Sequence, residues 1–445
     1  MSVNATAIRV AGPKRATWLS TSSFVGNVAS TFAAQVISLA LSIGASVIVA
    51  RYLGPQGKGL VAIAFLVPNM LCLMLDFGIG SANVYFMASR RLSLPELSSN
   101  SLMISLISSG IAACSVAIML KSGLLERIVP GIPIELLLFA LLAVPLLLAK
   151  NSLASIVQGA HRILTFNFIT LLQSFCLLAL TLVLVAGMKM GVWGAVLATL
   201  FSTAAALIAT AIVLRREKAD LVPRWNADVL RRTVVYGLKN YIANLLQFFN
   251  YRLDLLLVNF FLGTAGAGIY SIAVGSAEML WYFPNAVAFV LFPKSANQPA
   301  AEVRKLIPRV LKYTLGPTLV GAVALALFGK AAIRIVYSTK FLPSYVPMLA
   351  LLPGIVFLSL SKVLTAHIAG RGFPVFNSYI SGLGLLTTIV LDVVLIPKQG
   401  VLGASIASTI AYGVHLLASV YFYRKVVHVS EQRESFPVPL QGTAK

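Results

Sequence analysis

Apolar stretches long enough to cross a membrane recur along almost the whole chain. A helix crosses the hydrocarbon core of a bilayer with about 20 predominantly apolar residues. One set of such stretches covers residues 24–50, 60–87, 101–120, 134–157, 164–187 and 192–214, and a second covers 236–262, 269–292, 310–337, 346–369, 375–396 and 401–423. The sequence therefore predicts an all-α polytopic membrane protein of about 12 transmembrane helices.

Composition and charge agree with lipid as the surrounding solvent. Charged residues make up 11% of the 445-residue chain and hydrophobic residues 58%, whereas a soluble domain carries roughly 25% charged residues. The net charge of +22 could suggest a nucleic-acid partner. The basic residues, however, follow the loops and do not cluster in a soluble domain, so we expect no nucleic acid.

The loop charges also predict an orientation. If the N-terminus is cytoplasmic, most of the 35 Lys and Arg residues fall on the inner side, as the positive-inside rule requires. We therefore expect a multi-pass protein of the cytoplasmic (inner) membrane with both termini in the cytoplasm. The first apolar run is too long for a signal peptide, so it reads as an uncleaved anchor.

No cofactor or metal site is expected. Cys72, Cys114 and Cys176 all lie inside predicted spans without metal-ligand or disulfide spacing. The histidines at positions 161, 367 and 415 are scattered in the same way.

An internal repeat divides the chain into two related halves. Residues 53–59 (LGPQGKG) recur as 262–268 (LGTAGAG), and 191–195 (GVWGA) recur as 400–404 (GVLGA), both at an offset of 209 residues. Six spans is an even number, so the two halves enter the membrane in the same direction, as in transporters built from parallel repeats.

The repeat predicts four segments. Residues 1–214 form an N-terminal six-helix lobe, 215–235 a cytoplasmic connector that serves as a hinge, 236–424 a C-terminal six-helix lobe and 425–445 a cytoplasmic tail. The two pseudo-symmetric lobes are expected to enclose a central cavity.

Polar side chains follow one face of the seventh span. Asn240, Asn244, Gln247, Tyr251 and Asp254 are spaced by four, three, four and three residues, which places them together on a helix. The equivalent face of the first span is also polar and includes Gln35. Polar groups inside a membrane usually face the bundle interior or a wet cavity, although individual amides can also act as interhelical contacts.

The second and eighth spans carry a further matching pair. Asn69 and Asp76 are seven residues apart, and the positions 209 residues later are Glu278 and Asn285. Each pair combines one amide and one carboxyl group on one helix face. Together with the polar stripe, this favours a lined cavity between the lobes.

Four basic residues lie in or at the ends of spans: Arg51, Lys150, Arg252 and Lys362. Arg252 and Asp254 are about 200° apart around their helix, so they must face different neighbours. Asp76, Asp254 and Glu278 could neutralise these cations as structural pairs. Lys150 and Lys362 occupy near-equivalent places in spans four and ten, where they suit either a phosphate or snorkelling to the interface, and Arg51 could anchor the interface.

Several motifs resemble the polysaccharide flippases of the multidrug/oligosaccharidyl-lipid/polysaccharide exporter superfamily. Residues 50–59 (ARYLGPQGKG) match that family's A-R-x-L-G-P-x-G-x-G junction, and 76–82 (DFGIGSA) its D-x-G-x-G-S-A run. Residues 158–162 (QGAHR) and 191–195 fit its fourth-to-sixth-span region. The turn at 334–345 matches in part, since Ser338 and Thr339 stand where the family has a glycine and an acid.

The resemblance implies a carrier that moves an undecaprenyl-diphosphate-linked oligosaccharide across the cytoplasmic membrane by alternating access, for surface or exopolysaccharide synthesis. It implies anion binding by Arg51, Lys150, Arg252 and Lys362. From the polar stripe, we expect the side chains of Gln35, Asn240, Asn244 and Gln247 to line the same substrate site. Asp76, Asp254 and Glu278 would couple transport to a cation or hold the basic residues. The implied partners are the lipid-linked oligosaccharide, membrane lipid and other polysaccharide assembly proteins.

Two other classes remain open. A multidrug or cation antiporter of the same superfamily shares the architecture, but would want carboxylates without neighbouring cations. A polytopic polysaccharide polymerase or ligase usually carries a sizeable extracytoplasmic loop with catalytic residues, and the outer loops here are short. We therefore expect no enzymatic activity and no catalytic residues.

Overall fold

The computed structural model describes residues 21–435, and that part of the chain is helical with no β-strand. The first half contains α1 (Thr21–Leu75), α2 (Ile79–Ala88), α3 (Leu94–Lys121), α4 (Leu124–Ile128), α5 (Ile134–Leu141), α6 (Ala143–Gly159), α7 (Ile163–Thr181) and α8 (Gly191–Arg216). The second half contains α9 (Ala227–Glu278), α10 (Tyr282–Asn297), α11 (Ala300–Val336), α12 (Tyr345–Gly370), α13 (Pro374–Gln399) and α14 (Val401–Ser435). The predicted all-α class is confirmed.

Ten helical stretches within the described residues are long and apolar enough to cross a membrane. Two of them, Ser30–Leu75 with 46 residues and Tyr241–Ala296 with 56, far exceed a single crossing. The backbone leaves helical geometry at Gly54 (φ 68°) in the first and at Gly263 (φ 72°) in the second. Glycine adopts this left-handed region without strain. Each long stretch therefore has two arms, and the count of twelve spans stays a prediction.

Large apolar side chains cover the outside of the bundle. On α11, Tyr313, Val320 and Leu327 are 72%, 71% and 69% exposed and are spaced by seven residues, so they share one face. A soluble protein rarely exposes such continuous apolar surface. The fold is that of a multi-pass membrane protein.

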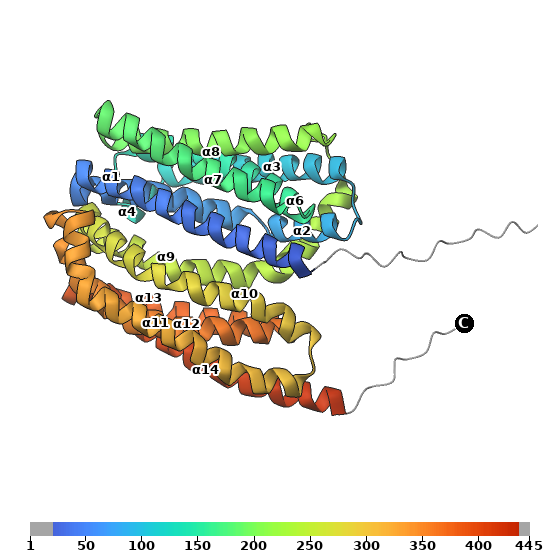
Figure 1. Cartoon of the computed structure of the whole chain (residues 1–445). Helices are drawn as coiled ribbons and strands as arrows, with labels where there is room; N and C mark the ends of the chain where they lie inside the picture. Colours follow the sequence, from blue (N-terminus) through green and yellow to red (C-terminus); the bar gives the residue numbers. More distant parts are fainter. Residues whose placement is uncertain (1–20, 436–445) are drawn as a thin grey trace, which may run out of the picture.

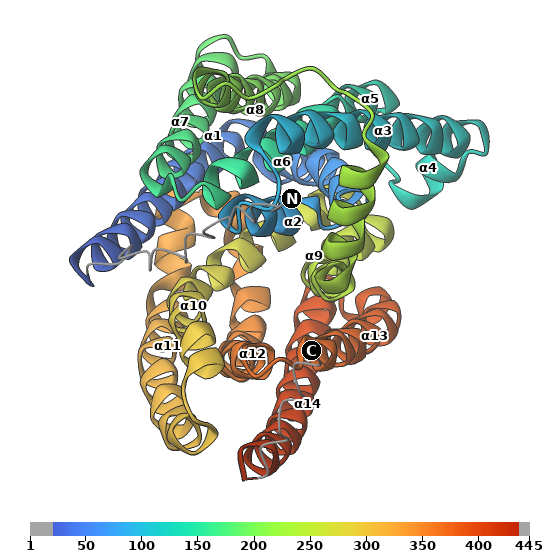
Figure 2. The ribbon, with the colours of Figure 1, turned by 90° about the vertical axis from the view of Figure 1, so that its right-hand side faces the viewer.

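The helices form two lobes. Figure 1 shows α1, α2, α3, α6, α7 and α8 on one side of the molecule and α10 to α14 on the other, with α9 between them. Figure 2, turned by 90°, shows the same division and places α9 beside both groups. The lobes meet chiefly where α1 packs against α9.

The repeat is visible in the backbone. Gly54 and Gly263 have nearly equal torsions, and Gly191 and Gly400 both have φ 62°. Each pair is 209 residues apart. The two halves are therefore pseudo-symmetric at these turns, as the repeat predicts.

The two repeated junctions touch each other across the lobe interface. A Cβ atom on Gly59 would overlap the carbonyl oxygen of Thr264, and a Cβ on Gly268 would overlap that of Pro55. Pro55 and Thr264 are themselves equivalent in the repeat. The glycines of the motif are thus required because main chain packs against main chain.

The segment between α8 and α9 is fastened to the N-terminal lobe. Ser98 and Ser99 on α3 donate to the carbonyl oxygens of Asp220 (2.9 Å) and Val222 (2.7 Å). Further on, the rings of Tyr85 and Tyr236 stack with centroids 4.3 Å apart. The two hydrogen bonds hold the predicted hinge against α3, and the ring stack holds the first arm of α9 against α2. The bounds of the four predicted segments stay predictions.

Candidate functional site

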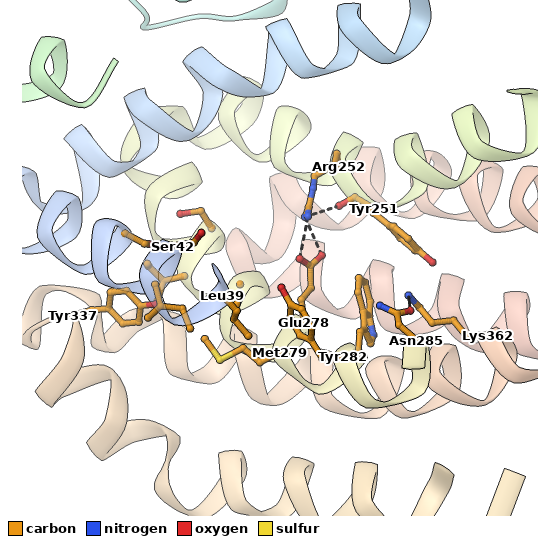
Figure 3. A pocket seen from close by; sticks show the side chains of 16 residues that line it. Leu39, Ser42, Tyr251, Arg252, Glu278, Met279, Tyr282, Asn285, Tyr337 and Lys362 are labelled. Atoms are coloured by element: carbon orange, nitrogen blue, oxygen red, sulfur yellow. Dashed lines mark hydrogen bonds and ion pairs between the residues drawn. The ribbon is translucent and has the colours of Figure 1, made fainter. Parts of the chain in front are cut away.

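A cavity of about 500 Å³ lies between the lobes (Figure 3). It is lined from α1 by Leu39, Ser42, Ile43 and Ser46, from α9 by Tyr251, Arg252, Ser271, Gly275 and Glu278, and from the later helices by Trp281, Tyr282, Asn285, Tyr337 and Lys362. A second cavity of about 440 Å³ shares Arg252, Ser271, Gly275 and Glu278 with the first. The two cavities therefore adjoin each other at the Arg252–Glu278 pair.

Arg252 and Glu278 face each other across the two arms of α9. The guanidinium donates from Nη1 to Oε1 at 2.9 Å and from Nη2 to Oε2 at 3.1 Å, and Figure 3 shows this bidentate arrangement. The side chains are 37% and 17% exposed, so the pair borders open space. Of the acid–cation pairs that the sequence left open, the structure forms the one between Glu278 and Arg252.

Lys362 enters the same cavity from α12. Its Nζ donates to Oδ1 of Asn285 at 2.8 Å and lies 4.6 Å from the ring centroid of Trp281 and 5.5 Å from that of Tyr251. No carboxylate of the described residues lies within ion-pair distance of it. Lys362 is therefore a cavity cation whose neighbours are two aromatic rings and the amide of Asn285.

Asp254 faces away from Arg252, as the helical spacing requires. It is 2% exposed, and it accepts hydrogen bonds from the hydroxyls of Tyr270 (2.5 Å) and Ser408 (3.3 Å) and from the N–H of Leu255 (2.7 Å). Its neighbour Asp392 on α13 is 0% exposed, and neither carboxylate oxygen has a hydrogen-bond partner among the described residues. The C-terminal lobe thus contains a buried acidic cluster beside the second cavity, whose lining includes Asp254.

Lys150 lies apart from these residues. It lines a separate cavity of about 180 Å³ in the N-terminal lobe, together with Asn151, Gln158 and Gln173. Its Nζ donates to Oε1 of Gln173 at 3.2 Å. The expected pair of lysines is therefore divided between two lobes and two cavities.

Two further charged residues predicted for the site, Asp76 and Arg51, form hydrogen bonds with main-chain groups at helix ends. Asp76 occupies the break between α1 and α2, where the N–H groups of Gly78 and Gly80 donate to its carboxylate. Arg51 donates from Nε to the carbonyl oxygen of Val336 at 2.8 Å and from Nη2 to that of Ile335. Neither side chain borders the central cavities.

The predicted amides are spread along α1 and α9. Gln247 donates to the hydroxyl of Tyr251 at 2.8 Å, close to the Arg252 pair. Asn244 and Gln35 are exposed on their helices. The side chain of Asn240 lies outside the described residues. Of the stripe, Tyr251 lines the cavity of about 500 Å³ and Asp254 lines the adjoining cavity of about 440 Å³.

Sequence reasoning missed Trp281, Tyr270, Ser408 and Asp392. Asp392 had a usable signal, because a carboxylate inside an apolar run is costly. Trp281 had none, since a tryptophan in a span most often packs against neighbours or the interface. Ser408 reaches Asp254 across 154 residues of sequence, and no local pattern predicts such a contact.

Two repeated helical lobes around a polar cavity form the architecture of a membrane transporter. A family model described as "Polysaccharide biosynthesis protein" matches residues 48–346, more than half of the chain. The chain therefore belongs to this family, and its predicted membership of a polysaccharide flippase family is confirmed.

Similar proteins agree with this assignment. The probable low-salt glycan biosynthesis flippase Agl15 of Haloferax volcanii is 21% identical over 209 residues, 44% of this chain and 43% of that protein. The chain spans less than half the length of the curated relatives it matches.

Two solved structures share the fold. The inward closed conformation of the lipid II flippase MurJ matches with a TM-score of 0.74 and 15% identity, covering 90% of both chains. An inward-facing multidrug resistance MATE family transporter matches with a TM-score of 0.71 and 17% identity, covering 88% of this chain and 96% of the other. At these identities the likeness shows the fold alone.

Proposed function

We propose that this chain is a flippase that moves an undecaprenyl-diphosphate-linked oligosaccharide from the inner to the outer leaflet of the cytoplasmic membrane. The observation that carries the proposal is the charge of the central cavity. Lys362 stands there without a carboxylate partner among the described residues, next to an arginine that already binds a carboxylate in bidentate fashion. A diphosphate is a doubly acidic ligand suited to such a pair.

Arg252 and Lys362 would make different contacts with the diphosphate. The planar guanidinium suits bidentate contact with phosphate oxygens, whereas the ammonium acts as a compact point charge on a flexible stem. Glu278 orients Arg252 when no substrate is present and competes with a phosphate for the same donors. Asn285 and Ser271 add neutral polar groups to the lining, as a sugar would require.

Transport would proceed by alternating access of the two lobes. The main-chain contacts of Gly59 and Gly268 support a closed face at the repeated junctions, and the adjoining cavities supply the binding space. Asp254 is the carboxylate we propose for coupling to a proton or another cation, because it is buried and forms no ion pair with a base among the described residues. Lys150 and its amides would contact a more distant part of the glycan.

The competing functions find less support. A cation antiporter would use unopposed acids in the central cavity, whereas Glu278 is neutralised there by Arg252. Asp254, which lines the adjoining cavity, is 2% exposed and accepts a hydrogen bond from Tyr270. A polymerase or ligase needs an acid and base set near an outer loop. The 122–133 loop offers Glu126 and Arg127, and among the described residues neither forms an ion pair that would make such a set.

Polymer export in a strain that lacks the gene tests the proposal. Wild-type chain should restore export, and Arg252→Ala with Lys362→Ala should abolish it. Arg232→Ala is a matched control, since Arg232 pairs with Asp228 in an exposed ion pair on α9. Flipping of a fluorescent undecaprenyl-diphosphate glycan in proteoliposomes gives the direct readout. Full export by the double variant would overturn the proposal.

A further inference from the structure

The ammonium of Lys362 rests in an aromatic cage formed by Tyr251 and Trp281. The two ring centroids are 4.9 Å apart, and Tyr412 backs both rings at 6.2 Å and 6.0 Å. Nζ lies over both cage rings, 5.5 Å from the Tyr251 centroid and 4.6 Å from the Trp281 centroid. The rings come from the two arms of the helical stretch that contains α9, and the lysine comes from α12.

Aromatic faces in this arrangement attract cations. The negative face of a ring draws an ammonium within about 6 Å of its centroid, and cages of this kind recognise quaternary ammonium groups. The cage opens into the cavity of about 500 Å³, which also exposes Glu278. Without the lysine, the same lining would suit an organic cation in shape and in polarity.

Two positive charges of the protein, Arg252 and Lys362, already occupy the cavity. Arg252 donates to both oxygens of Glu278, so the charge of that carboxylate is already offset by a cation of the protein. Lys362 has one amide partner, Asn285, and otherwise faces the rings. Because it is tethered to α12, its effective concentration at the cage exceeds that of any free cation at ordinary levels.

We propose that Lys362 is the permanent occupant of a cation site, and that its ammonium excludes organic cations from the central cavity. Lys362 thereby determines specificity, since its ammonium occupies the ring cage that an organic cation would otherwise enter. This inference goes beyond the proposed flippase activity and does not depend on it.

Equilibrium binding of tetraphenylphosphonium to the purified full chain in nanodiscs tests the inference. Wild-type chain should show no saturable binding at millimolar probe. Lys362→Met removes the charge, keeps a flexible apolar stem and vacates the cage, so it should bind the probe at least about tenfold more tightly than wild type. Lys362→Gln, which can still donate to Asn285, should show the same gain if the methionine variant does not fold.

Lys150→Met is the matched control. Lys150 is a half-buried lysine bonded to an amide oxygen, that of Gln173, but no ring cage surrounds it among the described residues. Its loss removes the same charge from the protein and should leave probe binding at the wild-type level. Lys362→Arg should also stay at that level, and Trp281→Leu added to Lys362→Met should cancel the gain.

Three results would overturn the inference. These are saturable binding by the wild type within the cage, an equal gain from Lys150→Met, and no gain from either neutral variant at position 362 when both are folded. Failure of the flippase proposal would look different. Glycan-lipid flipping would then be absent from wild-type proteoliposomes, whatever the variants do to cation binding.

Discussion

Arg51 on α1 caps the last turn of α11 by donating from Nε to the carbonyl oxygen of Val336 at 2.8 Å. A second donor reaches Ile335. The last carbonyls of a helix have no partner within it, and a cation there is favoured by the helix dipole. Since α1 and α11 belong to different halves of the repeat, this contact ties the lobes together.

Arg51→Ala should therefore loosen the interface near the repeated junctions. A cation at a helix C-terminus contributes about 0.3–1 kcal/mol, so the open population should rise roughly two- to fivefold. The readout is labelling of Ser42→Cys by an impermeant maleimide from the outer side, in a chain without Cys72, Cys114 and Cys176. Arg51→Lys should label at an intermediate rate. Equal rates for all three chains would contradict the capping role.

Gly59→Ala should destabilise the folded protein by about 1–3 kcal/mol, because its Cβ meets rigid main chain at Thr264. Thermal unfolding of the purified protein measures this. Gly110→Ala on α3 is the control, since nothing lies within 4 Å of a Cβ there, and alanine favours a helix over glycine. An unchanged melting temperature for Gly59→Ala would contradict the stabilising role of this close main-chain contact.

Glu278→Gln should free Arg252 for anions. The amide keeps the shape of the side chain but removes the charge that competes for the guanidinium, so inorganic pyrophosphate should bind at least about tenfold more tightly. Isothermal titration at low salt measures the change. Adding Arg252→Gln should remove the gain. If pyrophosphate affinity stays constant across the three chains, the ion pair does not gate anion binding.

Asn83→Ala should weaken the N-terminal lobe. Asn83 is 0% exposed, and its amide nitrogen donates to Ser101 (2.8 Å), the carbonyl oxygen of Ser152 (3.0 Å) and Ser155 (3.2 Å). Loss of these bonds should cost about 1–3 kcal/mol in thermal unfolding. Ser122→Ala is the control, because that exposed hydroxyl bonds its own helix end and should change stability by less than about 0.5 kcal/mol. A similar loss of stability in both variants would contradict a stabilising role of the Asn83 hydrogen bonds.

The sequence predicts the lobes well because the driving features are local or periodic. Apolar runs predict the helices, and the 209-residue repeat makes Gly54 and Gly263 equivalent positions of the two halves. The opposite faces of Arg252 and Asp254 follow from helix geometry alone. Where each of them finds its partner does not, because Glu278 and Ser408 approach only after the helices pack.

The same limit applies to the isolated cations. Lys150 and Lys362 look alike in sequence, since each stands in an apolar span of its lobe. Packing gives one an amide in a small cavity and gives the other a pair of rings in the central cavity. Arg51 likewise matches a family motif, but the carbonyl groups it caps lie 284 and 285 residues away.

The contacts of Gly59 with Thr264 and of Gly268 with Pro55 are made by main-chain atoms. Immobilising a flexible side chain at an interface costs about 0.5–1.5 kcal/mol, and these glycines have no side chain to immobilise. For the proposed flippase, closing this face would order no rotamers at the two glycines. Separating and rejoining the lobes would then need no search among side-chain conformations at these two positions.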